Sequence, residues 1–139
     1  MNVVDANIAL GLVAMRQDDR AAAQEPYEAL RPFHGPLAVQ DYGFLSVDRL
    51  LALLARTMDR FDDGAGHFEH AVALCRKGGY RPELALTCCD YADLLLESNN
   101  GEGRTKATAL LDESLAISGE LGMRPLMERV LSRREILKA

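Results

Sequence analysis

The stretch Gly79-Tyr80-Arg81-Pro82 recurs 43 residues later as Gly122-Met123-Arg124-Pro125. The helical patterns that flank the two copies recur with the same offset: Phe68, Ala73 and Leu74 correspond to Leu111, Ala116 and Ile117. A fixed period of roughly 20 to 50 residues is typical of solenoids, in which stacked units bury one continuous core. We therefore expect a helical-repeat fold with an extended surface for partners.

The composition agrees with a helical protein. Of the 139 residues, 48% are hydrophobic but only 6% are aromatic, and Ala and Leu, both strong helix formers, dominate the apolar residues. No stretch shows the sustained alternation of β-branched residues that strands need. The sequence predicts an all-α fold in which residues 1–139 form a single domain.

The net charge of −5 argues against general nucleic-acid binding. Residues 124–139 carry five basic and two acidic side chains, but helical spacing spreads the cations over separate sides. Cations near the carboxyl end of a helix suit its macrodipole. We therefore expect neither a nucleic-acid nor a membrane partner.

The cysteines and the amino terminus indicate a cytoplasmic protein. Cys75, Cys88 and Cys89 are odd in number and lie in apolar helical patterns, where Cys behaves as a small hydrophobe. A disulfide framework is therefore not expected, and a reducing compartment is. The apolar segment 1–15 contains Asp5, lacks a basic start and is too short to span a membrane.

Apolar periodicity and capping residues predict the helices. The expected ranges are about 4–17, 20–32, 46–58, 62–78, 82–97, 104–121 and 125–138. Asp18-Asp19 and Ser46 precede helices as N-caps, and Gly78-Gly79 and Gly122 end them. Pro26 predicts a kink or a late start in the second helix. Residues 32–44 predict a long connector that packs on the helices.

Small and aromatic residues inside each helical pair resemble tetratricopeptide repeats (TPRs), in which small residues let paired helices pack closely and an aromatic residue fills the groove. The matching residues are Leu10-Gly11, Ala14, Ala23, Tyr27 and Leu30 in the first pair; Leu51-Ala52, Ala55, Phe61, Gly64, Phe68 and Ala71 in the second; and Cys88, Tyr91, Ala107, Leu111 and Ser114 in the third. The resemblance implies a right-handed solenoid with repeats at about 1–34, 45–79 and 81–122 and a terminal helix at about 124–138.

The chain also departs from the TPR pattern. Asp18 and Asp59 stand where the family often has Gly after its first helix, and the third pair is seven residues longer than the second. The period of 43 exceeds the family's usual length of about 34.

More narrowly, residues 50–55, 67–74, 90–96 and 107–122 resemble the C-terminal repeats of large bacterial signalling ATPases. Those proteins join an ATPase module to a nucleotidyl cyclase or a LuxR-type DNA-binding domain. The resemblance implies a regulatory or partner-binding segment. The sequence contains no Walker A motif and no helix-turn-helix, so those activities are not carried over.

Three groups of residues are candidate chemical sites. Asp63, His67 and His70 share one helical face and can ligate a divalent metal, although a solvated flank is the commoner outcome for such a pattern. Cys88 and Cys89 point about 100° apart, so we expect Cys88 in the core and Cys89 as the more reactive thiol. Residues 101–106 lack the spacing of a phosphate loop and predict a turn. The sequence thus predicts no enzyme, catalytic residue, metal or cofactor.

The first helix of each pair lines the concave side of such repeats. The repeat register places these predicted partner-binding residues there: Leu12, Arg16, Arg49, Leu53, Arg56, Cys89 and Asp93. An apolar floor flanked by arginines suits an extended peptide or an acidic helix, unless the connector 32–44 or the terminal helix already fills the groove.

The expected function is a non-enzymatic interaction or regulatory scaffold that binds a peptide or a sister domain in this groove. One alternative is a regulatory domain that senses a small molecule or a metal, near the groove or at Asp63, His67 and His70. A further expectation is a homodimer formed through the apolar first helix.

Overall fold

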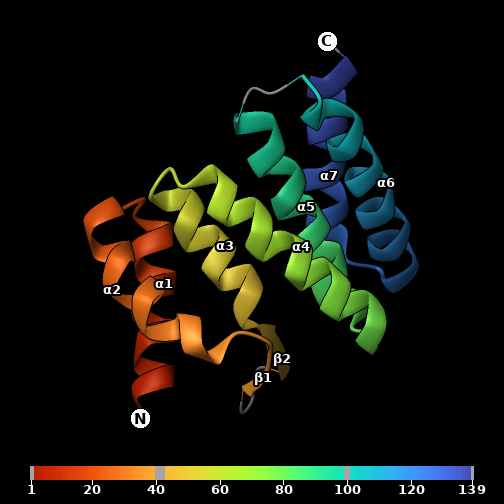
Figure 1. Ribbon diagram of the computed structural model, residues 1–139. Helices are drawn as coiled ribbons and strands as arrows, with labels where there is room; N and C mark the ends of the chain where they lie inside the picture. Colours follow the sequence, from red (N-terminus) through yellow and green to blue (C-terminus); the bar gives the residue numbers. More distant parts are fainter. Residues whose placement is uncertain (1, 40–42, 99–100, 139) are drawn as a thin grey trace. The chain divides into compact units, whose positions relative to one another are not determined.

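The computed structural model describes residues 2–39, 43–98 and 101–138, with side chains for 2–35, 46–98 and 101–138. Its helices are α1 Val3–Arg16, α2 Arg20–Leu30, α3 Val47–Thr57, α4 Phe61–Gly78, α5 Arg81–Glu97, α6 Gly103–Leu121 and α7 Arg124–Lys138, with a 3-10 turn at Arg31–Phe33 (Figure 1). The all-α class is therefore confirmed. The chain forms two compact units, residues 1–74 and 75–139, with the boundary inside α4.

Side-chain caps start the helices where the sequence predicts them. Asp19 accepts a hydrogen bond from the Ala22 amide at 3.0 Å, and Ser46 accepts one from the Arg49 amide at 3.2 Å. Asn2, which the sequence analysis did not identify, caps α1 in the same way. Each cap satisfies a backbone donor that the first helical turn leaves without a partner.

Pro26 does not delay α2, so the expected late start is wrong. The helix begins at Arg20 and continues through Pro26, which is buried. A Cβ atom added at Gly11 of α1 would lie 3.7 Å from Cβ of Pro26 and 3.3 Å from Cδ1 of Leu54. The missing side chain at Gly11 therefore lets α1 pack closely against α2 and α3.

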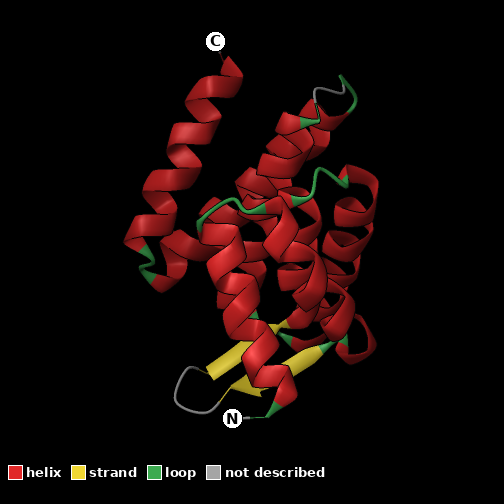
Figure 2. Cartoon of the chain, turned by 90° about the vertical axis from the view of Figure 1, so that its left-hand side faces the viewer, coloured by secondary structure: helices red, strands yellow, loops and turns green. Residues whose placement is uncertain are grey.

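The connector forms a short hairpin that the sequence analysis did not predict (Figure 2). Strand β1, Pro36–Val39, pairs antiparallel with β2, Gly43–Ser46, with Leu37 opposite Leu45. Gly35 at φ +115 turns the chain into the hairpin, and its carbonyl accepts a bond from the Val47 amide at 3.0 Å. Four-residue strands are too short to show alternation in sequence. The predicted packing of Leu37, Val39, Tyr42 and Phe44 lies outside the described side chains.

The core of the first unit joins α1, α2 and α3. Its buried residues are Ile8, Ala14, Ala23, Tyr27, Leu30, Val47, Leu50, Leu51, Leu54, Ala55 and Met58. Most residues that resemble the TPR pattern in α1, α2 and α3 are in this group. Leu10 is an exception, because it is exposed.

In the second unit α6 packs against both α5 and α7. The five residues predicted for the third pair are all buried: Cys88, Tyr91, Ala107, Leu111 and Ser114. The Ser114 hydroxyl donates to the carbonyl of Ala85 at 2.7 Å, which joins α6 to α5 through a buried bond. The predicted close contact of this pair is confirmed.

The two copies of the repeated tetrapeptide make the same turn. Gly79 and Gly122 have φ of +72 and +68 and follow α4 and α6. The Tyr80 amide donates to the carbonyl of Cys75 at 3.0 Å, and the Met123 amide donates to that of Ser118 at 2.8 Å. This hydrogen bond, together with the left-handed glycine, forms a Schellman motif at the end of each helix.

Asp18 and Asp59 make the same turn without glycine. Their φ values are +51 and +57, and the next amide donates five residues back, from Asp19 to Ala14 at 2.9 Å and from Arg60 to Ala55 at 2.8 Å. Asp tolerates the left-handed region better than most residues. These aspartates therefore end their helices with the same left-handed turn that Gly79 and Gly122 make.

Candidate functional site

The outer side of α1 is apolar and exposed. Only Asp5 and Arg16 of its 14 residues are charged, and its inner side holds the buried residues Asn7, Ile8, Gly11 and Ala14. The exposed fractions of its outer side chains are 74% for Val3, 55% for Leu10, 46% for Leu12 and 52% for Val13. Several large apolar side chains exposed on one short helix are a feature that interaction sites share.

The predicted partner-binding residues of the first unit lie on two helices. Leu12 and Arg16 are exposed on α1. Arg49, Leu53 and Arg56 follow one another at helical spacing along the least buried side of α3, where each is half-buried. Arg49 and Arg56 are already engaged in interactions within the chain.

The predicted residues of the second unit, Cys89 and Asp93, are buried, so the prediction that they present a surface needs correction. Arg129 of α7 donates through Nη2 to Oδ1 of Asp90 and to Oδ2 of Asp93, both at 2.7 Å, and Arg133 donates through Nε to Oδ1 of Asp93 at 2.7 Å. The terminal helix therefore covers this side of α5, which was the alternative considered for the groove.

Cys88 lies in the core as predicted, and Cys89, predicted to be the more reactive thiol of the pair, is buried as well. All three thiols are free and buried. Burial raises the pKa of Cys89 to about 11, with Asp93 and Asp90 adding to the rise against Arg129 and Arg133. Burial raises the pKa of Cys88 further still. A thiol held in the protonated form is a poor nucleophile.

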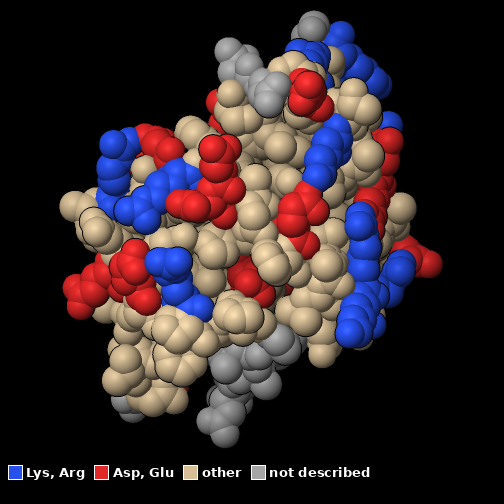
Figure 3. Space-filling view, viewed as in Figure 1, with Lys and Arg blue, Asp and Glu red and all other residues tan. Residues whose placement is uncertain are grey.

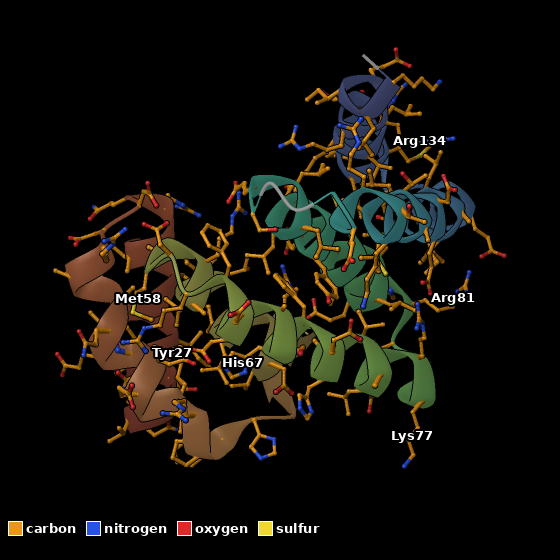
Figure 4. All side chains as sticks on the ribbon, turned by 45° about the horizontal axis from the view of Figure 1, so that its top comes forward. Tyr27, Met58, His67, Lys77, Arg81 and Arg134 are labelled. Carbon is orange, nitrogen blue, oxygen red and sulfur yellow. The ribbon has the colours of Figure 1, made fainter. Side chains whose placement is uncertain are left out.

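A cavity of about 250 Å³ in the first unit gathers all three histidines of the chain. Its lining residues are Arg31, His34, Asp48, Leu51, His67 and His70. Tyr27 of α2 and His67 of α4 point toward each other beside it, with 2.8 Å between the Tyr27 hydroxyl and Nε2 of His67 (Figure 4). This bond fixes the orientation of the His67 ring.

Burial favours the neutral form of His67 and the protonated form of Tyr27. Burial lowers the pKa of His67, an effect that Asp48 and Asp63 oppose and that Arg31 and His70 reinforce. Burial, aided by Asp63, raises the pKa of Tyr27. Both shifts favour an uncharged hydrogen bond between the two side chains.

The metal hypothesis placed Asp63, His67 and His70 together, but only the two histidines line the cavity. Within residues 2–39, 43–98 and 101–138, no three His, Cys, Asp or Glu side chains are arranged to hold a metal ion. The cavity also contains Arg31, His34 and Asp48, which come from other elements and were not predicted from the sequence. The sequence offered a hint for His34 alone, because it is one of only three histidines in the chain.

Acidic and basic side chains are interspersed on the face that Figure 3 shows. In the described part of the chain, the helices are too short or too polar to cross a membrane.

Comparison with protein-family models, with curated proteins and with solved structures finds no match for this chain.

Proposed function

We propose that the chain is a non-enzymatic protein-interaction module, built as a TPR-like solenoid, that acts through the outer side of α1. The observation that supports this most directly is the exposure of Val3, Leu10, Leu12 and Val13 on one short helix. The shared turn geometry at Gly79 and Gly122 supports the repeat architecture. Burying large apolar side chains from both partners supplies most of the free energy of such an association.

The partner that fits this side of α1 is a second copy of the chain. Asp5, Ala9, Leu12 and Arg16 recur at spacings of four, three and four, so they form one stripe along the exposed side. If two α1 helices pair antiparallel, Asp5 of each copy lies beside Arg16 of the other. Ala9, near the middle, lets the helices approach closely. A two-fold interface requires such self-complementarity.

A module that self-associates can set the oligomeric state of a signalling protein. The resemblance of four stretches to the C-terminal repeats of bacterial signalling ATPases supports a regulatory role of this kind. Arg49 and Arg56 are a weaker choice for the main interface, because both are half-buried and engaged within the chain.

Light scattering coupled to size exclusion tests the proposal, with the intact chain at about 100 μM. At this concentration even a dimer with a micromolar dissociation constant is populated. We expect a dimer for the natural sequence and a monomer for Leu12→Glu, because the new carboxylate would be buried in the interface. Leu131→Glu on α7 is a matched control, since Leu131 and Leu12 are both 46% exposed. It should leave the dimer intact.

Charge reversal tests the antiparallel arrangement itself. Asp5→Arg places like charges beside Arg16 and should weaken the dimer, whereas Asp5→Arg combined with Arg16→Asp should restore it. A natural sequence that stays monomeric would overturn self-association, and a dimer that survives Leu12→Glu would move the interface away from α1.

A further inference from the structure

The cavity of the first unit is lined by an acidic residue of which little is exposed. Asp48, the second residue of α3, is only 5% exposed and lines the cavity. Its carboxylate oxygens are not among the fully enclosed side-chain atoms of the described residues that lack a partner, so they are open to the cavity. His67 lies close enough to feel its charge, but Nε2 of His67 already bonds to Tyr27. A carboxylate at the wall of a cavity is stabilised by hydrogen-bond donors, so this site favours a ligand with an N–H donor.

Arg31 supplies the opposite charge in the same cavity. Its guanidinium carbon lies 5.7 Å from the centre of the Tyr27 ring, and one nitrogen contacts Oε2 of Glu28 at 3.3 Å. A guanidinium carries five N–H donors, so one such contact leaves others for a ligand carboxylate. Leu51 adds an apolar wall.

We propose that this cavity binds a small α-amino acid as its zwitterion, with the ammonium at Asp48, the carboxylate at Arg31 and the side chain against Leu51. The volume of about 250 Å³ lies below that of pockets for drug-sized ligands, which limits the ligand to a small metabolite. A simple carboxylic acid would leave Asp48 without a partner, and a simple amine would meet the charge of Arg31. This site is separate from the α1 interface and does not depend on it.

The histidines provide the reporters for a test. Because all three line the cavity, a ligand there should shift the ring C–H signals of His34, His67 and His70 in a ¹H–¹³C NMR spectrum. The probes are L-alanine, propionate and ethylamine, with a chelator in every sample to remove metal ions. Propionate and ethylamine each lack one head group of alanine. We expect saturable shifts with L-alanine and affinities at least about tenfold weaker for the other two.

Variants tie the shifts to the two charged residues. Asp48→Asn and Arg31→Gln should each weaken L-alanine binding by about tenfold or more, because each removes one ion pair with the ligand. Asp62→Asn is the matched control, since Asp62 is exposed and lies outside the cavity. It should bind as the natural sequence does. Far-UV circular dichroism checks folding, and Arg31, being exposed, gives a variant that folds even if Asp48→Asn does not.

Several outcomes overturn the inference. One is the absence of a saturable shift with L-alanine up to about 10 mM, a limit that excludes even millimolar affinity. Equal affinity for propionate would make the cavity an anion site, and equal affinity for ethylamine would make it a cation site. Unchanged binding by Arg31→Gln would remove the carboxylate from the proposed position.

Discussion

At Asp18 a side chain occupies a backbone conformation that glycine adopts more easily. Its φ of +51 lies in the left-handed region, and its side chain is exposed. We expect Asp18→Gly to raise the free energy of unfolding by about 0.5 kcal/mol, because relief of the left-handed strain exceeds the extra flexibility of glycine in the unfolded chain. Urea denaturation measures this change.

Gly122→Ala provides the opposite case at the equivalent turn. With φ of +68, the added Cβ atom should lower the free energy of unfolding by about 1 kcal/mol, although the space around it is open. If Asp18→Gly were destabilising, the left-handed turn would not be the source of strain at that position.

His67 makes the stability depend on pH. Burial lowers its pKa below the usual 6.5, so below pH 6.5 the unfolded chain binds more protons than the folded chain. The contribution of His67 to the free energy of unfolding should therefore be fully present above pH 6.5. It should be lost progressively as the pH falls below that value. Asp48 and Asp63 moderate the effect, while Arg31 and His70 increase it.

Urea denaturation between about pH 5 and 7.5 measures this dependence, because that range spans the ordinary pKa of histidine. His67→Gln, which can still bond to Tyr27, should flatten the curve. His34→Gln, at an exposed residue of the same cavity, should leave it unchanged. A flat curve for the natural sequence would contradict the lowered pKa.

At the scale of elements, buried ion pairs hold α7 to α5. Asp90 and Asp93 have side chains only 6% exposed and share the guanidinium of Arg129. Burial lowers the pKa of Arg129, but the two carboxylates raise it by more, so the guanidinium stays charged. Removing one partner of a buried ion pair is costly because the other charge stays buried.

Arg129→Met should lower the free energy of unfolding by about 2–3 kcal/mol, less than for a fully buried pair because Arg129 is partly exposed. Cys89 lies beside these charges, so its labelling by a thiol reagent should become faster in the variant. Arg134→Met is the control. Arg134 reaches the exposed Asp112 at 3.5 Å, and its loss should cost no more than about 0.5 kcal/mol. Equal effects of the two variants would contradict the buried ion pairs as the main contact.

At the scale of the whole molecule, self-association couples stability to concentration. If the chain dimerises through α1, its melting temperature should rise as its concentration increases from about 1 to 100 μM, because mass action favours the folded dimer. Leu12→Glu should abolish this dependence, and Leu131→Glu should preserve it. If the melting temperature of the natural sequence did not depend on concentration, the dimer would be contradicted, whatever the geometry of its interface.

The boundaries of the helices follow from local chemistry, so the sequence predicted most of them to within a few residues. Asp19 and Ser46 cap helices as expected, and Gly79 and Gly122 end them. The hairpin after Gly35 was missed, since four-residue strands have no distinctive period. Of the two outcomes expected at Pro26, a kink or a late start, the late start did not occur, because a propensity does not show where tertiary packing retains a proline inside a helix.

The sequence by itself thus determined the all-α class, the buried third helical pair and the apolar character of α1. Only the tertiary structure decided that Cys89 and Asp93 are covered by α7, because that depends on which side of α5 the last helix packs against. Only the tertiary structure places Arg31, His34 and Asp48 around one cavity with His67 and His70. These residues come from separate elements, and no periodicity within one element records a contact between elements.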